Sequence, residues 1–224
     1  YVASQCDLTT VADAQVPPFK PRKRLIVRNL PDKSLLTPSE GLEGTPTAIY
    51  IGDVRKSRGL FTILAAAEKA PHWNFEIIGN VSANDAFEVE LWKKNSDAAS
   101  RVHFRGRLAP REAWSYARTA WIGLTLLEST PAFVEAIPSK LYEYMSSGLA
   151  TISTPLPRCE KLIAESHGGA IAHNSDEVAR ILESWSSHPE VLRGLRENAL
   201  NWANSNLDSE REYLRFVEAV AELF

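Results

Sequence analysis

The sequence predicts an α/β fold, in which a doubly wound parallel sheet is covered by helices on both faces. The first observation is that short apolar runs alternate with helical stretches from Thr47 onward, which is the rhythm of βαβ units. The second is that each run is brief and apolar at successive positions, as in strands covered on both faces. The third is composition: 224 residues, 44% hydrophobic and 24% charged, are typical of a globular chain with a large core.

The expected strands are the short apolar runs Ala48–Ile51, Phe75–Ile78, Val102–Phe104, Trp121–Leu126, Ala150–Ser153 and Ala170–Ala172. The expected helices between and after them are Leu60–Ala70, Ala86–Lys94, Arg111–Thr119, Pro138–Ser147, Arg158–Glu165 and Ser175–Trp185. In the fourth helix, Pro138 suits the first turn and Gly148 suits the position after the last turn. Six βα units in about 140 residues make one Rossmann-like domain.

The segments on either side of these units differ from them. Residues Pro17–Pro46 are dense in proline, charge and turn formers, which predicts a linker whose only ordered feature is a short strand at Leu25–Val27. A helix-rich tail follows the sheet, with helices expected at Pro189–Asn201 and Ser209–Phe224. Apolar residues recur at three- and four-residue spacing in the last helix, so one of its faces is expected to pack against something.

Charge balance and cysteine count exclude several classes of protein. With 25 basic and 28 acidic residues, the net charge of −3 excludes a nucleic-acid binder that relies on bulk positive charge. The uncharged run Thr119–Leu127 is about half of the ~20 residues that a membrane-spanning helix needs. Cys6 and Cys159 lie far apart in the sequence, so neither a disulfide framework nor a thiolate zinc site is expected, and a reducing, cytoplasmic setting is the default.

Several motifs of catalysis and cofactor binding are absent from the sequence. There is no G-x-G-x-x-G, Walker A loop, H-E-x-x-H or G-x-S-x-G, which argues against dinucleotide cofactors, P-loop nucleotides, zinc and a hydrolase serine. There is also no Asp-x-Asp pair to hold a metal–diphosphate. We therefore expect neither a cofactor nor a metal.

Two loops at the carboxyl ends of expected strands are candidates for a ligand site, because open α/β sheets bind ligands there. The first runs from Gly52 to Gly59 and contains Arg55, Lys56 and Arg58. Its glycines let the backbone approach a ligand, and the start of the next helix adds partial positive charge, so the loop suits a diphosphate. The alternative is an ordinary solvated turn with surface basic residues.

The second loop enters a helix at Pro138 and contains two glutamates eight residues apart, Glu135 and Glu143. On one helix this spacing gives about 12 Å of rise and about 80° of rotation, so the two carboxylates reach two points of one elongated ligand. A nucleoside diphosphate sugar has that shape, with its phosphates facing the amino end of the helix. The alternative is a solvated helix face, on which Lys140 and Glu143 form a surface ion pair.

The stretch from Glu135 to Gly148 resembles the E-x7-E region of the group 1 glycosyltransferases, which have the two-domain GT-B fold. Three further landmarks resemble that family in the same order along the chain. They are Tyr50-Ile-Gly-Asp with Arg58-Gly-Leu, then Glu76-Ile-Ile-Gly79, then Val102-His-Phe-Arg-Gly106-Arg-Leu. The resemblance covers roughly Thr47 to Asp176, and an ordered set of four landmarks is more specific than any one of them.

The resemblance implies roles for particular residues. Glu143 is expected to accept hydrogen bonds from the ribose hydroxyls, while Glu135, near the transferred sugar, and Arg58, on the leaving diphosphate, are expected to be catalytic. The other residues expected to bind the donor are Gly52, Arg55, Lys56, Gly79, Arg105, Gly106, Arg107, Ile137, Ser139 and Lys140. This sequence departs from the family pattern at two positions. Asp53 stands where many relatives carry a basic residue. Pro138 stands where others have glycine or serine, and proline has no backbone N–H to donate to a phosphate.

The resemblance also implies a division of the chain, which would be the carboxyl-terminal half of a GT-B fold. Residues 1–46 are expected to be the tail of an amino-terminal domain and a linker. Residues 47–206 are expected to form the nucleotide-sugar-binding domain, and residues 207–224 a helix that packs toward the absent domain. That domain would hold the acceptor, a glycan or a lipid-linked molecule, so the chain alone is expected to be inactive.

The implied function is binding of a UDP-, GDP- or ADP-sugar for glycosyl transfer in polysaccharide biosynthesis, with retention of configuration. The implied location is the cytoplasm, with membrane contact through the absent half. Two alternatives stay open: a nucleotide-sugar-binding module without transfer chemistry, and a sugar-nucleotide epimerase of the same fold. Side chains do not identify the base, since base contacts in such folds are largely to the backbone, near Gly79 and Arg105 to Arg107.

Overall fold

The computed structural model describes residues 5–14, 17 and 21–223, and its main sheet has six parallel strands. The strands are β3 (Thr47–Ile51), β4 (Asn74–Ile78), β5 (Val102–Gly106), β6 (Ile122–Thr125), β7 (Ala150–Ser153) and β8 (Gly169–Ile171). Their order across the sheet is β5-β4-β3-β6-β7-β8. This confirms the predicted doubly wound, Rossmann-like sheet and places the reversal of strand order between β3 and β6.

Most α-helices lie close to their predicted positions. The helices are α1 (Leu60–Lys69), α2 (Ala86–Asn95), α3 (Pro110–Ser115), α4 (Ser139–Ser146), α5 (Pro157–Ser166), α6 (Ser175–Ser187), α7 (Pro189–Asn206) and α8 (Ser209–Ala221). Of these, α7 continues five residues beyond the predicted end at Asn201. The helix predicted at Arg111–Thr119 is wrong at its end, because α3 stops at Ser115 and a 3-10 turn over Tyr116–Arg118 follows. The Ser115 hydroxyl donates to the Glu112 carbonyl at 2.6 Å, a local hydrogen bond of the kind by which serine competes with a regular helix.

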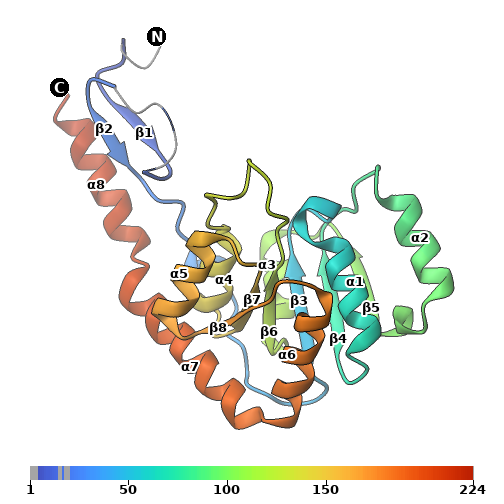
Figure 1. The fold of residues 1–224 in the computed structure, drawn as a ribbon. Helices are drawn as coiled ribbons and strands as arrows, with labels where there is room; N and C mark the ends of the chain where they lie inside the picture. Colours follow the sequence, from blue (N-terminus) through green and yellow to red (C-terminus); the bar gives the residue numbers. More distant parts are fainter. Residues whose placement is uncertain (1–4, 15–16, 18–20, 224) are drawn as a thin grey trace.

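Different helices cover the two faces of the sheet (Figure 1). Ala48 and Tyr50 of β3 pack in a cluster with side chains of α1 and α6. Ile49 and Ile51, which alternate with them, pack with side chains of α3 and α4. Both faces are therefore buried, which explains why the strands are apolar at successive positions.

Gly123 of β6 allows α4 to lie directly against the sheet. A Cβ at this position would come within 2.3 Å of the ring of Tyr144, which is fully buried. The Tyr144 ring also makes an edge contact with Trp114 of α3, with the ring centroids 5.6 Å apart. The lack of a side chain at Gly123 thus sets how closely α4 approaches the sheet where the strand order reverses.

We expect Gly123→Ala to lower the melting temperature by roughly 3–10 °C, because overpacking a tight core contact costs about 1–3 kcal/mol. Gly194→Ala is the matched control, since nothing lies within 4 Å of a Cβ placed at Gly194. Gly194 is inside α7, where alanine is the better helix former by about 1 kcal/mol. Thermal unfolding followed by circular dichroism measures both variants. Equal melting temperatures for Gly123→Ala and the parent would show that α4 can move away from the sheet without cost.

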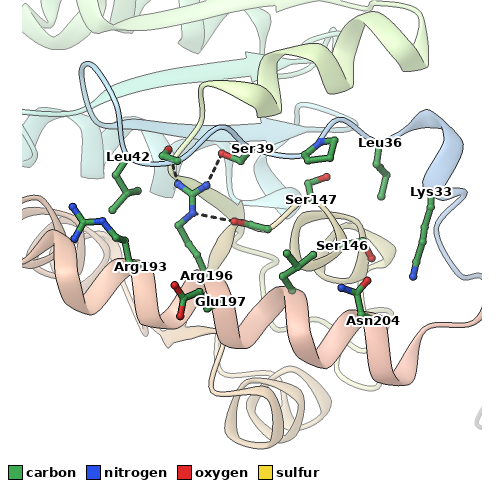
Figure 2. Close-up of a pocket in the computed structure, with 14 residues that line it drawn as sticks. Lys33, Leu36, Ser39, Leu42, Ser146, Ser147, Arg193, Arg196, Glu197 and Asn204 are labelled. Atoms are coloured by element: carbon green, nitrogen blue, oxygen red, sulfur yellow. Dashed lines mark hydrogen bonds between the residues drawn. The ribbon is translucent and has the colours of Figure 1, made fainter.

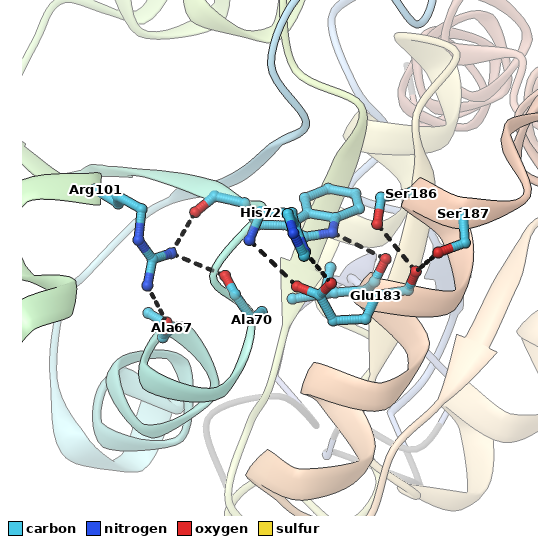
Figure 3. A network of polar contacts seen from close by, with 9 residues as sticks. Ala67, Ala70, His72, Arg101, Glu183, Ser186 and Ser187 are labelled. Atoms are coloured by element: carbon cyan, nitrogen blue, oxygen red, sulfur yellow. Dashed lines mark hydrogen bonds and ion pairs between the residues drawn. The ribbon is translucent and has the colours of Figure 1, made fainter.

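A polar network joins elements at the amino-terminal edge of the sheet (Figure 3). The Arg101 guanidinium donates to three main-chain carbonyl oxygens between residues 67 and 73, at 2.7–2.8 Å. Glu183 of α6 accepts from the backbone N–H of His72 at 3.4 Å, and its second carboxylate oxygen lies 2.5 Å from the imidazole Nδ1. These contacts tie the end of α1, the start of β4 and α6 together, at the edge opposite the strand carboxyl ends.

Two further strands, β1 (Thr9–Val11) and β2 (Arg24–Ile26), pair in parallel outside the main sheet. The prediction that the linker holds one short strand as its only ordered feature is therefore wrong. The strand has a partner upstream, and a 3-10 turn forms at Lys33–Leu35. A strand of three residues is too short to show a period that sequence reasoning can detect.

The last helix, α8, lies beside β2 and away from the main sheet (Figure 1). Arg28 Nε donates to Oε1 of Glu212 at 3.0 Å, and this charged residue of α8 is buried. Elsewhere on α8, Tyr213, Leu214 and Val217 are exposed. The apolar face predicted for this helix therefore lacks a cover among the residues that the structure describes.

The division of the chain into residues 1–46, 47–206 and 207–224 stays a prediction. The end of α7 at Asn206 coincides with the second of these boundaries. Residues 1–4, 15–16 and 18–20 of the first segment, and Phe224 of the last, lie outside the described residues.

Candidate functional site

The carboxyl ends of β3, β4 and β5 enclose a pocket of about 320 Å³ near the reversal of strand order. Its walls are residues that follow the strands and one residue of α3: Ile51, Gly52, Asp53, Ile78, Gly79, Asn80, Arg107, Leu108 and Ala113. Three residues predicted to bind a donor, Gly52, Gly79 and Arg107, are thus brought together from separate parts of the sequence. This is the edge at which doubly wound sheets bind ligands.

Glycine is required where three loops meet at this pocket. Gly79 adopts a φ of 143°, and a Cβ there would lie 1.8 Å from the carbonyl oxygen of Gly52. The Gly79 N–H donates to the carbonyl of Gly106 at 2.8 Å. Backbone groups of the loops after β3, β4 and β5 therefore lie side by side, as a site that contacts a base through the main chain requires.

The loop after β3 holds its basic side chains in different environments. Arg55 Nη2 lies 2.7 Å from the carboxylate of Asp53, so its charge is paired within the loop. The backbone N–H of Lys56 donates to Asp85 Oδ2 at 3.0 Å. Arg55 and Lys56 line a second hollow of about 250 Å³, which also includes Asp85 and Glu128. Asp53 thus reduces the positive charge that the loop offers to a phosphate.

We expect Asp53→Asn to raise the affinity for a nucleoside diphosphate about two- to fivefold at low salt, because the change removes a negative charge and releases Arg55. Calorimetric titration with UDP at low and at physiological salt measures the effect. Asp97→Asn, which makes the same change of charge just before β5 at the amino-terminal edge, is the control. The same gain in both variants would assign it to net charge and contradict the local explanation.

Arg58 presents an unpaired guanidinium at the end of this loop. Its central carbon lies 4.9 Å from the centre of the Phe133 ring, and its Nε is enclosed without a hydrogen-bond partner. No carboxylate in the described part of the chain lies within ion-pair distance of it. Burial raises the pKa of neighbouring Tyr50 to about 12, although the charge of Arg58 acts against this increase. Arg58, unlike Arg55, therefore has its charge available to a ligand.

The two glutamates of the E-x7-E segment do not lie on one helix, and that prediction is wrong. Pro138 is the N-cap of α4, with an extended ψ of 128°, so the helix begins only at Ser139. Glu135 lies before it, exposed, in a turn. The Glu135 carbonyl accepts from Arg158 Nη1 at 2.9 Å, and the other end of this guanidinium pairs with Asp13. Arg158 of α5 therefore holds the turn through the main chain and leaves the Glu135 carboxylate exposed.

Glu143 lies on α4 and is paired with Lys140. The Lys140 Nζ lies 2.6 Å from Glu143 Oε2, which makes a close ion pair. Oε2 is enclosed and has no hydrogen-bond partner within the described structure. The same ammonium lies 5.3 Å from the centre of the Trp114 ring. The predicted ion pair is confirmed, and it orients the carboxylate without satisfying its hydrogen-bonding capacity.

Ser139 and Ile137, which are also predicted to bind the donor, lie at and just before the start of α4 in different environments. The Pro138 N-cap supplies no side-chain acceptor, so the first-turn N–H groups, which begin with Ser139, keep their partial positive charge. Ile137 is partly buried against the cluster formed by α4, α5 and α7. The structure gives Ile137 a packing role, and its contact with a donor stays a prediction.

The side chain of Arg105 is already engaged. It donates from Nε and Nη2 to both carboxylate oxygens of Glu76 at 2.7 and 2.9 Å, and this hydrogen bonding raises its pKa. Its guanidinium also lies 5.3 Å from the centre of the Tyr116 ring. Any contact of Arg105 with a ligand is therefore expected to come from its main chain.

Three aromatic residues that sequence reasoning did not single out shape the site. Phe133 contacts Arg58, Trp114 contacts Lys140, and the hydroxyl of Tyr144 accepts the backbone N–H of Ile51 at 2.9 Å. The one available signal was that Tyr144 follows Glu143 directly, which by itself is a common arrangement. These contacts join residues far apart in the sequence.

A larger cavity, of about 560 Å³, lies at the other end of α4 (Figure 2). Arg196 of α7 crosses it and donates to the carbonyls of Gly148 and Gly41 and to the hydroxyl of Ser39, at 2.6–3.0 Å. Burial lowers the pKa of Arg196 to about 10, so the residue stays charged at neutral pH. Gly148 precedes β7, so this cavity lies at the amino-terminal edge of the sheet. The contacts of Arg196 with Gly41 and Ser39 hold the linker against α7.

Two kinds of feature are absent from the described residues. Among them, no group of three or more His, Cys, Asp or Glu side chains is arranged to hold a metal ion. None of the helices they form combines the length and the apolar character needed to cross a membrane.

A family model and a curated relative match this chain in sequence. The model for glycosyl transferases group 1 matches residues 33–202. A putative teichuronic acid biosynthesis glycosyltransferase, TuaH of Bacillus subtilis (strain 168), is 26% identical over 136 residues, which is 60% of this chain and 32% of that protein.

Solved structures share the fold at low sequence identity. A sucrose-phosphate synthase from Thermosynechococcus elongatus matches with a TM-score of 0.80 and 16% identity, over 100% of this chain and 60% of its own. The Anabaena protein HepE in complex with UDP-glucose matches with a TM-score of 0.76 and 15% identity, over 91% of this chain and 58% of its own. The chain thus spans less than two thirds of the length of each of these proteins.

Proposed function

The chain belongs to the group 1 glycosyl transferases, and from this premise we propose that it binds the nucleoside diphosphate sugar donor at the carboxyl edge of its sheet. The donor is a UDP-, GDP- or ADP-sugar. HepE, whose fold this chain shares, is described in complex with UDP-glucose, which supports a donor of this class. The name of TuaH, a putative teichuronic acid biosynthesis glycosyltransferase, supports a place in polysaccharide biosynthesis.

The observation that supports the proposal best is a pair of enclosed, opposite charges with free hydrogen-bonding capacity. Arg58 Nε is shielded from solvent without a hydrogen-bond partner, and Glu143 Oε2 is shielded with the Lys140 ammonium as its one charged neighbour, at 2.6 Å. Polar atoms of this kind are costly to a fold unless a ligand satisfies them. A nucleoside diphosphate matches both, because its phosphates accept from a guanidinium and its ribose hydroxyls donate to a carboxylate.

The chemistry that we propose transfers the sugar to an acceptor hydroxyl. The bond between the anomeric carbon and the diphosphate oxygen breaks, and the oxygen keeps the electron pair. A bond forms from the same carbon to the acceptor oxygen, whose proton is released. Arg58 stabilises the charge that grows on the leaving diphosphate, and the exposed Glu135 faces the reacting sugar. Glu143 holds the ribose, and transfer retains the configuration.

The acceptor, a glycan or a lipid-linked molecule, is held in this proposal by a further domain, which packs on the exposed face of α8. Contact with a membrane surface belongs to that domain as well. No metal ion takes part in this proposal, and the present chain binds the donor and supplies Arg58 and Glu135 to the reaction, while the acceptor comes from the further domain. The isolated chain therefore binds nucleotide without transferring sugar.

The direct test is a calorimetric titration of the chain with UDP, GDP and ADP, and with the corresponding nucleosides. We expect one diphosphate to bind more tightly than the other two and more tightly than its own nucleoside. A chain that is folded by circular dichroism but binds none of the three diphosphates would overturn the proposal. A transfer assay with a radiolabelled donor sugar tests the second part, and turnover by the isolated chain would refute it.

A further inference from the structure

Tyr144 connects the helix of one donor-binding residue to the loop of another. Its hydroxyl accepts the N–H of Ile51 at 2.9 Å, across 93 residues of sequence. Ile51 is the last residue of β3, directly before the loop that ends in Arg58. Tyr144 follows Glu143 on α4. One buried hydrogen bond therefore links the carboxylate proposed to hold the ribose with the loop proposed to hold the diphosphate.

At Ile51, β3 is no longer paired with its neighbouring strand β6. The Gly52 N–H donates to a carbonyl of β4 at 2.9 Å, and since N–H groups alternate along a strand, that of Ile51 points toward β6. Residue pairing between β3 and β6 ends at Ile49 and Gly123. Beyond that pair, the Tyr144 hydroxyl takes the place that a carbonyl of β6 occupies in a regular ladder. This is the point of strand reversal, where doubly wound sheets bind ligands.

Tyr144 is held in place on both sides. Its exposed fraction is 0%, its ring covers Gly123, and Trp114 packs against it at 62°. Burial raises its pKa well above the usual value, so the hydroxyl stays neutral at physiological pH. The hydrogen bond to Ile51 is therefore a fixed connection between α4 and β3.

We propose that Tyr144 is a positioning residue of the donor site, which fixes the separation between Glu143 and the loop of residues 52–59 so that one nucleoside diphosphate reaches both. The inference rests on the proposed function. A nucleoside contacts Glu143 and the base pocket but not the basic side chains of residues 52–59, so its affinity depends less on this separation. A nucleoside diphosphate contacts both sides, so its affinity depends on the separation more, because preorganisation reduces the cost of binding.

The test is Tyr144→Phe, which removes the hydroxyl and keeps the ring. Tyr142→Phe is the matched control, since Tyr142 stacks on Trp202 of α7 with the ring centroids 6.2 Å apart. We expect Tyr144→Phe to weaken binding of the preferred diphosphate about tenfold and that of its nucleoside less than twofold. The control changes neither by more than twofold. The backbone amide signals of Ile51 and Gly52 are expected to shift in the NMR spectrum of Tyr144→Phe alone.

Three outcomes overturn this inference. Equal affinity of Tyr144→Phe and the parent for the diphosphate shows that the hydroxyl only stabilises the fold. Equal weakening of diphosphate and nucleoside shows a general loosening of the site. A parent chain that binds no diphosphate removes the proposed function and this inference together, so the parent titration tells the two failures apart. If Tyr144→Phe does not fold, 3-fluorotyrosine at position 144 keeps the shape and weakens the hydroxyl as an acceptor, and the same comparison applies.

Discussion

Replacing Glu143 with alanine is expected to weaken the binding of a nucleoside diphosphate ten- to a hundredfold, which corresponds to about 1.4–2.7 kcal/mol. The Glu143 carboxylate is part-buried and its Oε2 is enclosed without a hydrogen bond, so vicinal ribose hydroxyls would form charge-assisted bonds with it in a site of low dielectric. The nucleoside is expected to lose affinity by a similar factor, because the ribose is common to both ligands. Calorimetric titration with diphosphate and nucleoside measures both effects.

Two further variants make the Glu143 experiment specific. Glu143→Gln keeps the shape but removes the charge that pairs with Lys140, and it is expected to lose less affinity than Glu143→Ala. Glu160→Ala removes an exposed glutamate from the first turn of α5 and is expected to leave both affinities within twofold of the parent. Unchanged binding by a folded Glu143→Ala protein would show that the ribose contact has been assigned to the wrong residue.

Replacing Arg58 with methionine is expected to weaken diphosphate binding by at least tenfold while the nucleoside loses less than threefold. Arg58 lacks an ion pair among the described residues, so its full charge is available to phosphate. Methionine keeps an apolar contact with Phe133, so the change tests charge more than packing. The comparison of UDP with uridine, or of the matching pair for the preferred base, is the measurement.

The control for Arg58 is Arg118→Met at the amino-terminal edge of the sheet. Arg118 forms an exposed ion pair with Glu40 at 3.3 Å, which contributes about 0–1 kcal/mol to stability and lies outside the candidate site. Its loss is expected to change neither affinity by more than twofold. Equal losses for diphosphate and nucleoside in Arg58→Met would contradict a contact with phosphate.

The architecture could be predicted from sequence because burial on both faces imposes a local pattern. The apolar runs at β3, β4 and β7 lie within one residue of their predicted ends, since each is bounded by turn formers or charge. The two-stranded sheet could not be predicted, because β1 has only three residues, too few to show a period. The early end of α3 coincides with a local serine hydrogen bond, which periodicity does not reveal.

The sequence predicts those features of the candidate site that depend on residues close together in the chain. The Lys140–Glu143 pair follows from their spacing on a helix, and the glycines at 52 and 79 follow from their places after strands. The pairing of Arg55 with Asp53 was not predicted, although the two are only two residues apart, because loop geometry decides it. The link from Tyr144 to Ile51 depends on the packing of α4 on the sheet, so only the folded structure shows it.

The Arg158 guanidinium touches two parts of the molecule that are far apart in sequence. One end pairs with Asp13, upstream of β2, and the other donates to the main chain at Glu135. One side chain of α5 therefore ties the segment between β1 and β2 to the turn that carries Glu135. The placement of that turn, and with it of the Glu135 carboxylate, thus depends on a residue of α5 that is shared with the amino-terminal segment.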